Sequence, residues 1–380
     1  MNILHVSDTH LGYAAYRKAN KEGINQRELD VYDSFKKFVD YAIKDQPDLI
    51  IHAGDLFDSV RPNNRAITFT LKQFVKLSEN NIPVIIISGN HEHPKLKETG
   101  HIFSIFDHIK NIYPVYKEKY EKIDLAINGK EISIHAIPQN NSKKDFEKEL
   151  KKLKPNKNSD FNIFISHGSV TGVQEFTMNE FNELIIPARV LSRDFDYIAL
   201  GHFHKYSKLA ENAFYSGSIE RLTFTEANEK KGFIRIDLSK NNLKTEFVEI
   251  ETREMIDSEP IKCSELKIDQ IMKKIKKQIK KIDPKEKTVR ITLDDISPNL
   301  YRNLDFNEIK KEFSNALHYE LKVNVKDKEN KKEGYSSSKI DALVNEFRNF
   351  IDSQEIDEKE ILVDMGVGYI EKIEAKNEGK

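Results

Sequence analysis

The chain has 380 residues, 38% of them hydrophobic and 32% charged, and a formal net charge of −1. This length predicts two or more folded units. The near-zero charge excludes a protein that attracts polyanions by its overall field, so a nucleic acid would have to meet local basic patches. The single cysteine, Cys263, excludes an internal disulfide, and no apolar run is long enough to span a bilayer. We therefore expect a cytoplasmic protein without a membrane segment.

The first 250 residues predict an α/β fold of short buried strands and amphipathic helices. Helical spacing of apolar residues predicts helices at 28–44, at 98–110 and after a cap at Asn63 or Asn64, with a charged helix or loop at 143–154. Strands are predicted at 2–7, 48–55, 84–87, 123–127, 131–137, 161–166, 195–200, 213–216, 232–238 and 243–250. Together they predict two mixed β-sheets with helices outside, which form a first domain, 1–250.

The rest of the chain predicts a small second domain and a tail. Residues 255–326 predict an α+β cap, with helices at 268–282 and 306–317 and strands at 289–293 and 321–325. Residues 327–338 are almost without apolar side chains and predict a linker. Apolar residues recur at helical spacing in 339–375, and so short a segment cannot bury them alone, which predicts a partner surface. The partner contacts expected here are Leu343, Phe347, Phe350 and Ile351.

Asp, Asn and His residues follow the ends of five predicted strands. They are Asp8, His10, Asp55, Asn90, His167, His202 and His204. Because ligands bind at the carboxyl ends of strands in α/β folds, we expect these side chains to converge on one site. Two divalent ions about 3.5–4 Å apart can hold a phosphodiester and activate water. Nitrogen and oxygen ligands without thiolate favour Mn, Fe or Zn. His91, next to a predicted ligand, suits a proton or hydrogen-bond donor to a leaving oxygen.

In this order these motifs resemble the calcineurin-like metallophosphoesterase signature. The resemblance implies that Asp55 bridges two ions and that His91 assists the leaving group. It also implies a first ion on Asp8, His10 and His204, and a second on Asn90, His167 and His202. The sequences His52-Ala53-Gly54-Asp55-Leu56-Phe57-Asp58 and Gln26-Arg27-Glu28 are most similar to SbcD-type double-strand-break repair nucleases.

The SbcD-type resemblance implies a manganese-dependent DNA exonuclease and endonuclease associated with the prokaryotic nucleoid. It implies two Mn²⁺ per subunit, with Fe, Zn or Mg as possible substitutes. It further implies a homodimer that docks onto a coiled-coil ABC-type ATPase, with residues 1–250 as the nuclease domain, 255–326 as a DNA-binding cap and 339–375 as the ATPase-binding segment.

Other assignments from the sequence leave alternatives open. Basic residues beside the motifs are candidate phosphate contacts, although solvated surface side chains explain each of them equally well. These are Arg17, Lys18, Arg61, Arg65, Lys95 and Lys205. Apolar stripes on 67–77 and 102–109 predict a dimer contact that includes Phe106, and His93 is expected on a surface loop. Rival functions are a small-nucleotide phosphodiesterase, a protein phosphatase and a non-catalytic scaffold. The residues after Asp55 lack the Asp-Arg-Gly of the protein phosphatases.

Overall fold

The fold was analysed in a computed structural model that describes residues 1–171, 183–191, 194–240, 242–325, 347, 351, 359 and 362–367. The chain divides into two compact units, Met1–Asn324 and Val325–Lys380. Most of the predicted linker and ATPase-binding segment, including Leu343 and Phe350, lies outside the described residues. The predicted boundary between nuclease domain and cap falls inside the first unit and stays a prediction.

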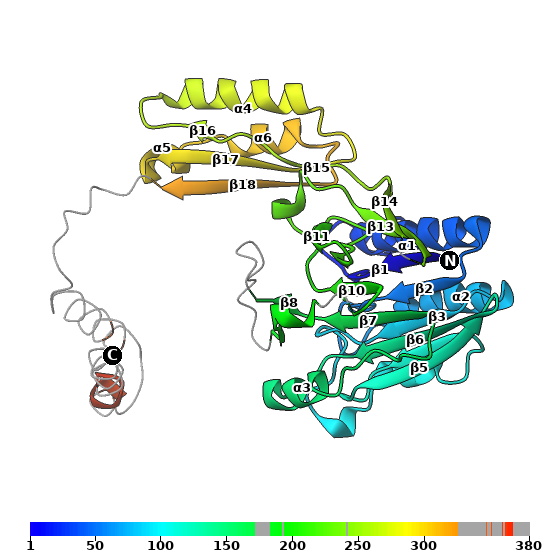
Figure 1. The fold of residues 1–380 in the computed structure, drawn as a ribbon. Coiled ribbons are helices and arrows are strands. Elements are labelled where there is room, and N and C mark those ends of the chain that lie inside the picture. The colour runs from blue at the N-terminus through cyan, green and yellow to red at the C-terminus, as the bar shows by residue number, and fades with distance from the viewer. Residues whose placement is uncertain are drawn as a thin grey trace. The chain divides into compact units, whose positions relative to one another are not determined.

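Two six-stranded mixed sheets dominate the first unit (Figure 1). In the first sheet, four neighbouring strands are parallel, and each of the two further strands pairs antiparallel with its neighbour. Its order is β14 (Asn242–Glu249), β13 (Gly232–Ser239), β1 (Asn2–Val6), β2 (Leu49–His52), β3 (Val84–Ile87) and β4 (Ile112–Val115). Since β1 to β3 run parallel, their carboxyl ends open onto one edge of the sheet.

The second sheet has four parallel strands between two antiparallel edge strands. Its order is β11 (Ser207–Ala210), β12 (Ala213–Tyr215), β10 (Tyr197–Gly201), β7 (Phe161–His167), β6 (Lys130–Ile137) and β5 (Glu121–Ile127). A two-residue turn, Asn128-Gly129, joins β5 and β6, with the positive φ values of 51° and 73° that a type I′ turn requires. A short parallel pair, β8 (Ser169–Val170) and β9 (Ile185–Ile186), stands apart from both sheets.

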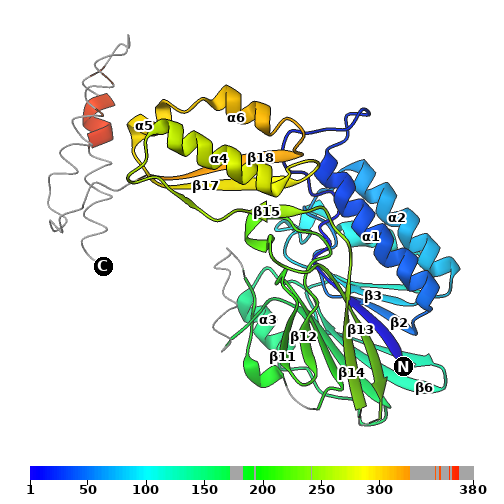
Figure 2. The same ribbon diagram turned by 90° about the horizontal axis from the view of Figure 1, so that it is seen from above.

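The two sheets pack face to face with helices on the outside. Alternate residues of β1, β2 and β3 meet those of β6, β7 and β10 in one buried apolar cluster between the sheets. The opposite face of the first sheet is covered by α1 (Gln26–Asp45) and α2 (Asn64–Glu79), which lie side by side (Figure 2). The outer face of the second sheet packs on α3 (Lys143–Leu150). The predicted α/β sandwich is confirmed.

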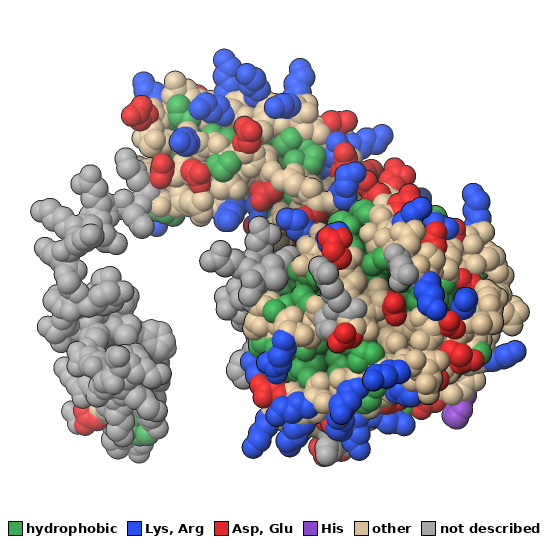
Figure 3. Space-filling view, in the orientation of Figure 1, with side chains coloured by type: hydrophobic (Ala, Val, Ile, Leu, Met, Phe, Trp, Pro, Cys, Tyr) green, Lys and Arg blue, Asp and Glu red, His purple; other side chains and the backbone are tan. Residues whose placement is uncertain are grey.

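The cap is a four-stranded sheet with three helices and its own apolar core. Its strands are β15 (Met255–Asp257), β16 (Ile261–Lys262), β17 (Thr288–Ile296) and β18 (His318–Val325), and its helices are α4 (Ile268–Ile282), α5 (Pro298–Arg302) and α6 (Phe306–Glu312). Isoleucines form the buried face of α4, and Figure 3 shows Lys and Arg side chains gathered on the outer surface above it. Polar contacts hold the cap to the sandwich, among them that from Lys18 Nζ to the Ala316 carbonyl at 2.6 Å.

Several elements differ from the sequence prediction. The segment 98–110 is not one helix but two 3₁₀ helices, Lys97–Thr99 and Ile102–Phe106, because Gly100 takes φ 70° and His101 caps the second. Phe106, expected at a subunit contact, is wholly buried against Phe74 in the core. Further 3₁₀ helices are Ala188–Val190 and Phe224–Glu226.

The cap also corrects the prediction at α6. This helix ends at Glu312 rather than near 317, and His318 is the first residue of β18. The His318 ring stacks on Tyr16 at a centroid distance of 3.7 Å. The Tyr16 ring is therefore engaged with the cap.

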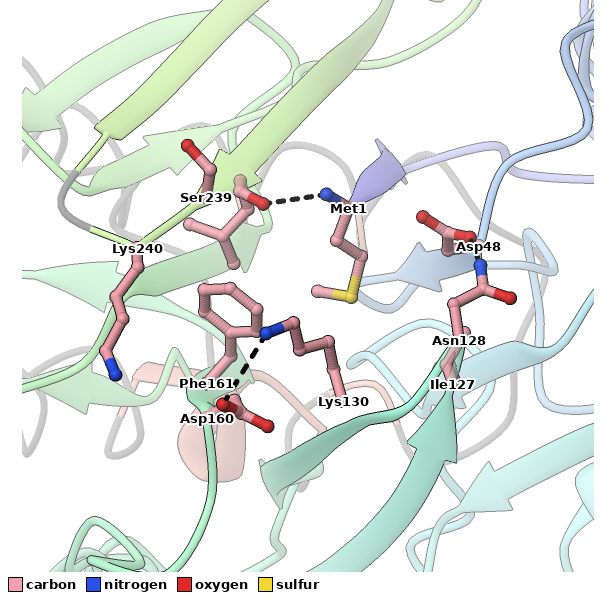
Figure 4. Close-up of a pocket in the computed structure, with 10 residues that line it drawn as sticks. Met1, Asp48, Ile127, Asn128, Lys130, Asp160, Phe161, Ser239 and Lys240 are labelled. Carbon is pink, nitrogen blue, oxygen red and sulfur yellow. Dashed lines mark hydrogen bonds and ion pairs between the residues drawn. The ribbon is translucent and has the colours of Figure 1, made fainter.

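Within the part of the chain that the structure describes, no helix is long and apolar enough to cross a membrane. A cavity of about 370 Å³ lies at the amino-terminal ends of β1, β2 and β7, beside the Lys130–Asp160 ion pair (Figure 4). It is at the opposite end of these strands from the candidate ligands.

Candidate metal centre

The seven predicted ligands lie just after the carboxyl ends of five strands. The first sheet supplies Asp8 and His10 after β1, Asp55 after β2 and Asn90 after β3, and the second supplies His167 at the end of β7 and His202 and His204 after β10. Backbone hydrogen bonds lock the first two loops together, for example from the Asp8 N–H to the Gly54 carbonyl at 3.0 Å. The site therefore straddles the junction between the two sheets.

One group of donors contains Asp8, His10 and His204, whose ligand atoms lie within 4.8 Å of one another. The Nε2 atoms of His10 and His204 are 3.1 Å apart. Two ring nitrogens that face each other so closely are well placed to share a cation. The His204 Nδ1 donates to Glu226 at 3.1 Å, which directs its Nε2 into the site.

A second group is centred on Asp55 and His167. The His167 Nε2 lies 3.3 Å from Asp55 Oδ2 and 3.0 Å from Asn90 Oδ1. The His167 Nδ1 donates to the Ala53 carbonyl at 2.9 Å, so the ring presents Nε2 to the site. The His202 Nδ1 is 3.3 Å from the same Asn90 oxygen. These contacts bring together the residues expected around the second ion.

Asp55 lies between the two groups. Its Oδ2 is 3.8 Å from His10 Nε2 and 3.3 Å from His167 Nε2, and it belongs to donor groups with Asp8 and with His91 as well. A carboxylate within reach of both sides is the geometry that a bridging ligand requires.

The backbone around the site is shaped to bring these donors close. A Cβ at Gly89 would lie 2.1 Å from Asp55 Oδ1, and one at Gly54 would lie 2.4 Å from His167 Nδ1. Asp55 itself has φ 55°, and Asp8 has φ 51°, both in the left-handed region that non-glycine residues seldom adopt. Such local strain is typical of functional sites. Imidazole and carboxylate donors without thiolate fit a pair of divalent transition-metal ions.

The electrostatics of the site also favour cations. Burial alone would raise the pKa of the Asp55 carboxyl, but the charge of His167 and its hydrogen bond hold that pKa well below its usual range. Burial lowers the pKa of His167, yet Asp55 and Asp8 raise it to about 10. A ring that holds its proton so tightly marks a place where positive charge is stabilised, and a metal ion would take the place of that proton.

His91 lies at the rim of this centre. Its ring is 36% exposed, its Nε2 is 4.0 Å from Asp55 Oδ2, and its backbone N–H donates to Asp55 Oδ1 at 3.0 Å. The Nδ1 donates to the Asp58 carbonyl at 3.2 Å, which leaves Nε2 for another partner. The Asp58 carboxylate lies 3.3 Å from His10 Nδ1 and orients the His10 ring.

Three buried residues of the site were missed by the sequence analysis. Glu226 holds His204 and also pairs with Lys231 at 2.6 Å, a lysine without any exposed surface. Glu92 accepts hydrogen bonds from Gly89 N at 2.7 Å and from Phe57 N at 3.3 Å. Burial and the charge of Asp55 raise the pKa of Glu92 to about 8. Only the position of Glu92, two residues after Asn90, offered a local signal.

The predicted DNA contacts divide into two groups. Two are engaged within the protein: Arg65 pairs with the buried Glu28 at 3.0 Å, and Lys18 donates to the Ala316 carbonyl of the cap at 2.6 Å. The other four are Arg17, Arg61, Lys95 and Lys205, and all six side chains are exposed. His93, expected on the surface, is buried and bonded to Glu118 at 2.8 Å, which corrects that assignment.

The fold and the metal centre define a calcineurin-like phosphoesterase. Residues 1–206 match that family, and the chain belongs to it. Proteins similar to this chain have a more specific description than the family. A DNA double-strand break repair protein Mre11 from Methanocaldococcus jannaschii is 33% identical over 274 residues, which cover 68% of this chain and 69% of that protein. The chain is thus a member of the Mre11 group.

Two further relatives have the same description. The Mre11 protein of Methanococcus maripaludis is 28% identical over 375 residues, 94% of this chain and 92% of that protein. That of Sulfurisphaera tokodaii is 38% identical over 209 residues, 53% of this chain and 48% of that protein. The similarity to the Methanococcus maripaludis protein extends over the cap as well as the sandwich.

Proposed function

We propose that the protein is a metal-dependent nuclease that cleaves DNA during the repair of double-strand breaks. The observation that carries this proposal is the convergence of three carboxylate or amide groups and four imidazoles on one junction between the sheets, in a chain of the Mre11 group. As a calcineurin-like phosphoesterase, the protein hydrolyses phosphate esters. DNA as substrate follows from the relatives.

The residues of the centre have different roles in phosphodiester hydrolysis. We assign Asp8, His10 and His204 to one ion, with Asn90, His167 and His202 on the other and Asp55 between them. Two such ions, when bound, activate a water and neutralise charge on the phosphate. His91 lies outside the ligand set. With Nδ1 fixed by the Asp58 carbonyl, it holds a proton at Nε2 and donates to the leaving oxygen.

Manganese is the metal we propose, with iron, zinc and magnesium as possible substitutes. Two considerations support it. The donors mix imidazole nitrogen with carboxylate and amide oxygen, and this set suits Mn or Fe better than an all-oxygen metal such as Ca. Two carboxylates against two divalent ions also leave a net positive charge, which attracts an anionic phosphate.

Four exposed basic side chains are proposed to contact DNA phosphates. Arg17 follows β1, Arg61 follows β2, Lys95 follows β3 and Lys205 follows β10, so each lies on a loop that also carries ligands. Because phosphate contacts are electrostatic, we expect them to contribute to affinity for any sequence and to weaken with salt.

A homodimer is proposed through the outer flank of α2. The buried side of this helix contains Ala66, Phe74 and Leu77, whereas Leu71 is only partly covered and Val75 is 40% exposed. An apolar stripe left uncovered on a surface helix suits a second copy of the same helix across a two-fold axis.

The C-terminal segment is proposed to bind the coiled-coil ABC-type ATPase. In the second unit, Phe347 packs closely against Gly366 and Ile351 is buried, so these two residues support the segment itself. Leu362 and Met365 remain 39% and 58% exposed. They add exposed apolar side chains to the predicted contacts Leu343 and Phe350.

One experiment tests the function. Purified protein with Mn²⁺ is offered linear duplex DNA, single-stranded DNA, p-nitrophenyl phosphate esters and a phosphopeptide, and we expect cleavage of DNA. His91→Ser should lower turnover by about 10²–10⁴-fold with metal content unchanged, whereas His108→Ser, at an exposed histidine, should match the unaltered protein. Hydrolysis of the phosphopeptide alone, or no hydrolysis at all, would refute the proposal.

A further inference from the structure

A small polar cavity opens beside His91. It has a volume of about 210 Å³ and lies where the loops after β3 and β6 meet, joined by a hydrogen bond from Gln139 N to the Ser88 carbonyl at 2.9 Å. Its lining consists of Asn90, His91, His93, Lys95, Gln139, Asn140 and Asn141. The cavity thus borders the proposed acid and one proposed ligand, and none of the roles assigned above uses it.

Most of its walls are fixed by hydrogen bonds within the protein. The Asn141 Nδ2 donates to Glu118 Oε1 at 2.6 Å and to the Pro94 carbonyl at 3.0 Å, and His93 bonds the same carboxylate at 2.8 Å. The Asn140 Nδ2 donates to the Glu118 carbonyl at 2.8 Å. These groups form a preorganised wall rather than a mobile surface.

Gln139 differs from its neighbours. Its side chain is only 5% exposed. Among the residues that the structure describes, its carboxamide has no hydrogen-bond partner, whereas the amide groups of Asn140 and Asn141 are both engaged. The carboxamide is not one of the fully buried polar groups without a partner, so its atoms reach the solvent in the cavity and can pair with a ligand there. Its oxygen accepts and its nitrogen donates, so it can pair with a group that offers both.

The chemistry of the lining selects among possible occupants. The lining has a single lysine, and the Glu118 carboxylate sits behind the wall, so an isolated phosphate would find little positive charge. The neutral Gln139 carboxamide, on a nearly buried part of the wall, instead suits the edge of a nucleobase. The volume is below the roughly 300 Å³ at which pockets for drug-sized ligands begin, which limits the occupant to about one ring system.

We propose that this cavity binds the base of the nucleotide that carries the leaving oxygen, and that Gln139 hydrogen-bonds the base edge. The proposal rests on the proposed function, because it places that nucleotide beside His91. Lys95, at the exposed rim, is positioned for the phosphate of the same nucleotide. Removal of a base from its stack into a side pocket would also separate this nucleotide from its complementary strand.

Calorimetric titration tests this site without turnover. The Mn²⁺-loaded protein is titrated with 2′-deoxyadenosine 5′-monophosphate and with 2-deoxyribose 5-phosphate, which has no base. We expect the nucleotide to bind about tenfold more tightly. Gln139→Met keeps the side-chain volume and should remove this difference without changing affinity for the sugar phosphate. Gln73→Met is the matched control, since Gln73 is also 5% exposed but lies on α2, and it should retain the difference.

Two results would overturn the inference. One is equal affinity of the unaltered protein for the two ligands, and the other is a Gln139→Met protein that still prefers the nucleotide. If DNA is cleaved with Mn²⁺ while either result is found, the base site alone fails and the nuclease assignment stands. If DNA is not cleaved by the same preparation, it is the proposed function that fails.

Discussion

Replacement of Glu226 by Gln is the sharpest test of how the metal centre is held. This carboxylate accepts from His204 Nδ1 at 3.1 Å and from Lys231 Nζ at 2.6 Å. Gln keeps the shape but removes the negative charge. The His204 ring then keeps only a neutral amide in place of the charged acceptor that fixes its orientation, and the buried Lys231 loses one of its two carboxylates.

The contacts give the expected size of the loss in metal affinity and of the loss in free energy of unfolding. Loss of a hydrogen-bond partner behind a metal-binding histidine weakens metal affinity by about 10–100-fold. A buried charge stripped of all its partners costs about 3–5 kcal/mol. Lys231 retains Glu229 at 2.8 Å and Ser218 Oγ at 3.0 Å, so we expect a lower cost, about 2 kcal/mol.

The stability effect has a defined pH dependence. Burial alone would raise the pKa of the Glu226 carboxyl, but the hydrogen bond from His204 and the charge of Lys231 hold that pKa well below its usual range. A group whose pKa is depressed in the folded state stabilises the protein fully above its unfolded-state pKa of about 4.3. The difference in free energy of unfolding between the unaltered protein and Glu226→Gln should therefore be complete at pH 7. It should shrink as pH falls below about 4.

The assay combines Mn²⁺ titration by calorimetry with urea unfolding of the metal-free proteins. Glu229→Gln is the matched control because it removes the other carboxylate of Lys231 without contact to His204. It should lower stability while leaving metal affinity unchanged. If Glu226→Gln binds Mn²⁺ as tightly as the unaltered protein, or if Glu229→Gln weakens binding equally, the positioning role of Glu226 is refuted.

Three further changes probe other parts of the chain. Gly89→Ala would drive a Cβ into the bridging carboxylate, so elemental analysis should find less than half of the normal metal; full occupancy would contradict the proposed bridge. Val75→Glu should convert a dimer into a monomer in sedimentation, whereas Lys72→Glu on the same helix should not, and an unchanged dimer in the first variant would reject that face. Truncation after Gly334 should abolish capture of the ATPase but leave cleavage of short DNA intact; undiminished capture would contradict the assignment of the tail.

The metal centre was predictable because its signals are local. Each ligand directly follows a short apolar strand, and the parallel arrangement of β1 to β3 brings Asp8, Asp55 and Asn90 to one edge. Local apolar patterns also located most of the strands and helices of the sandwich. Local patterns cannot show contacts between distant segments, which is why Glu226 and Lys231 were missed.

The errors have equally physical causes. Apolar residues in 98–110 recur at helical spacing, but a left-handed Gly100 interrupts the chain and leaves two short turns. Phe106 belongs to the apolar stripe, and sequence alone cannot tell a residue in the core from one at a subunit contact. His93 is drawn inside by Glu118, a residue 25 positions away.

The division of ligands between the sheets has a consequence for folding. Three strands of one sheet and two of the other supply the donors, so bound ions act as crosslinks between the two halves, in addition to the apolar side chains and hydrogen bonds that already join them. Free metal concentration should then set the melting temperature. In a cell poor in metal the protein would lack this added stability, and metal scarcity would first reach the protein as a fall in its amount.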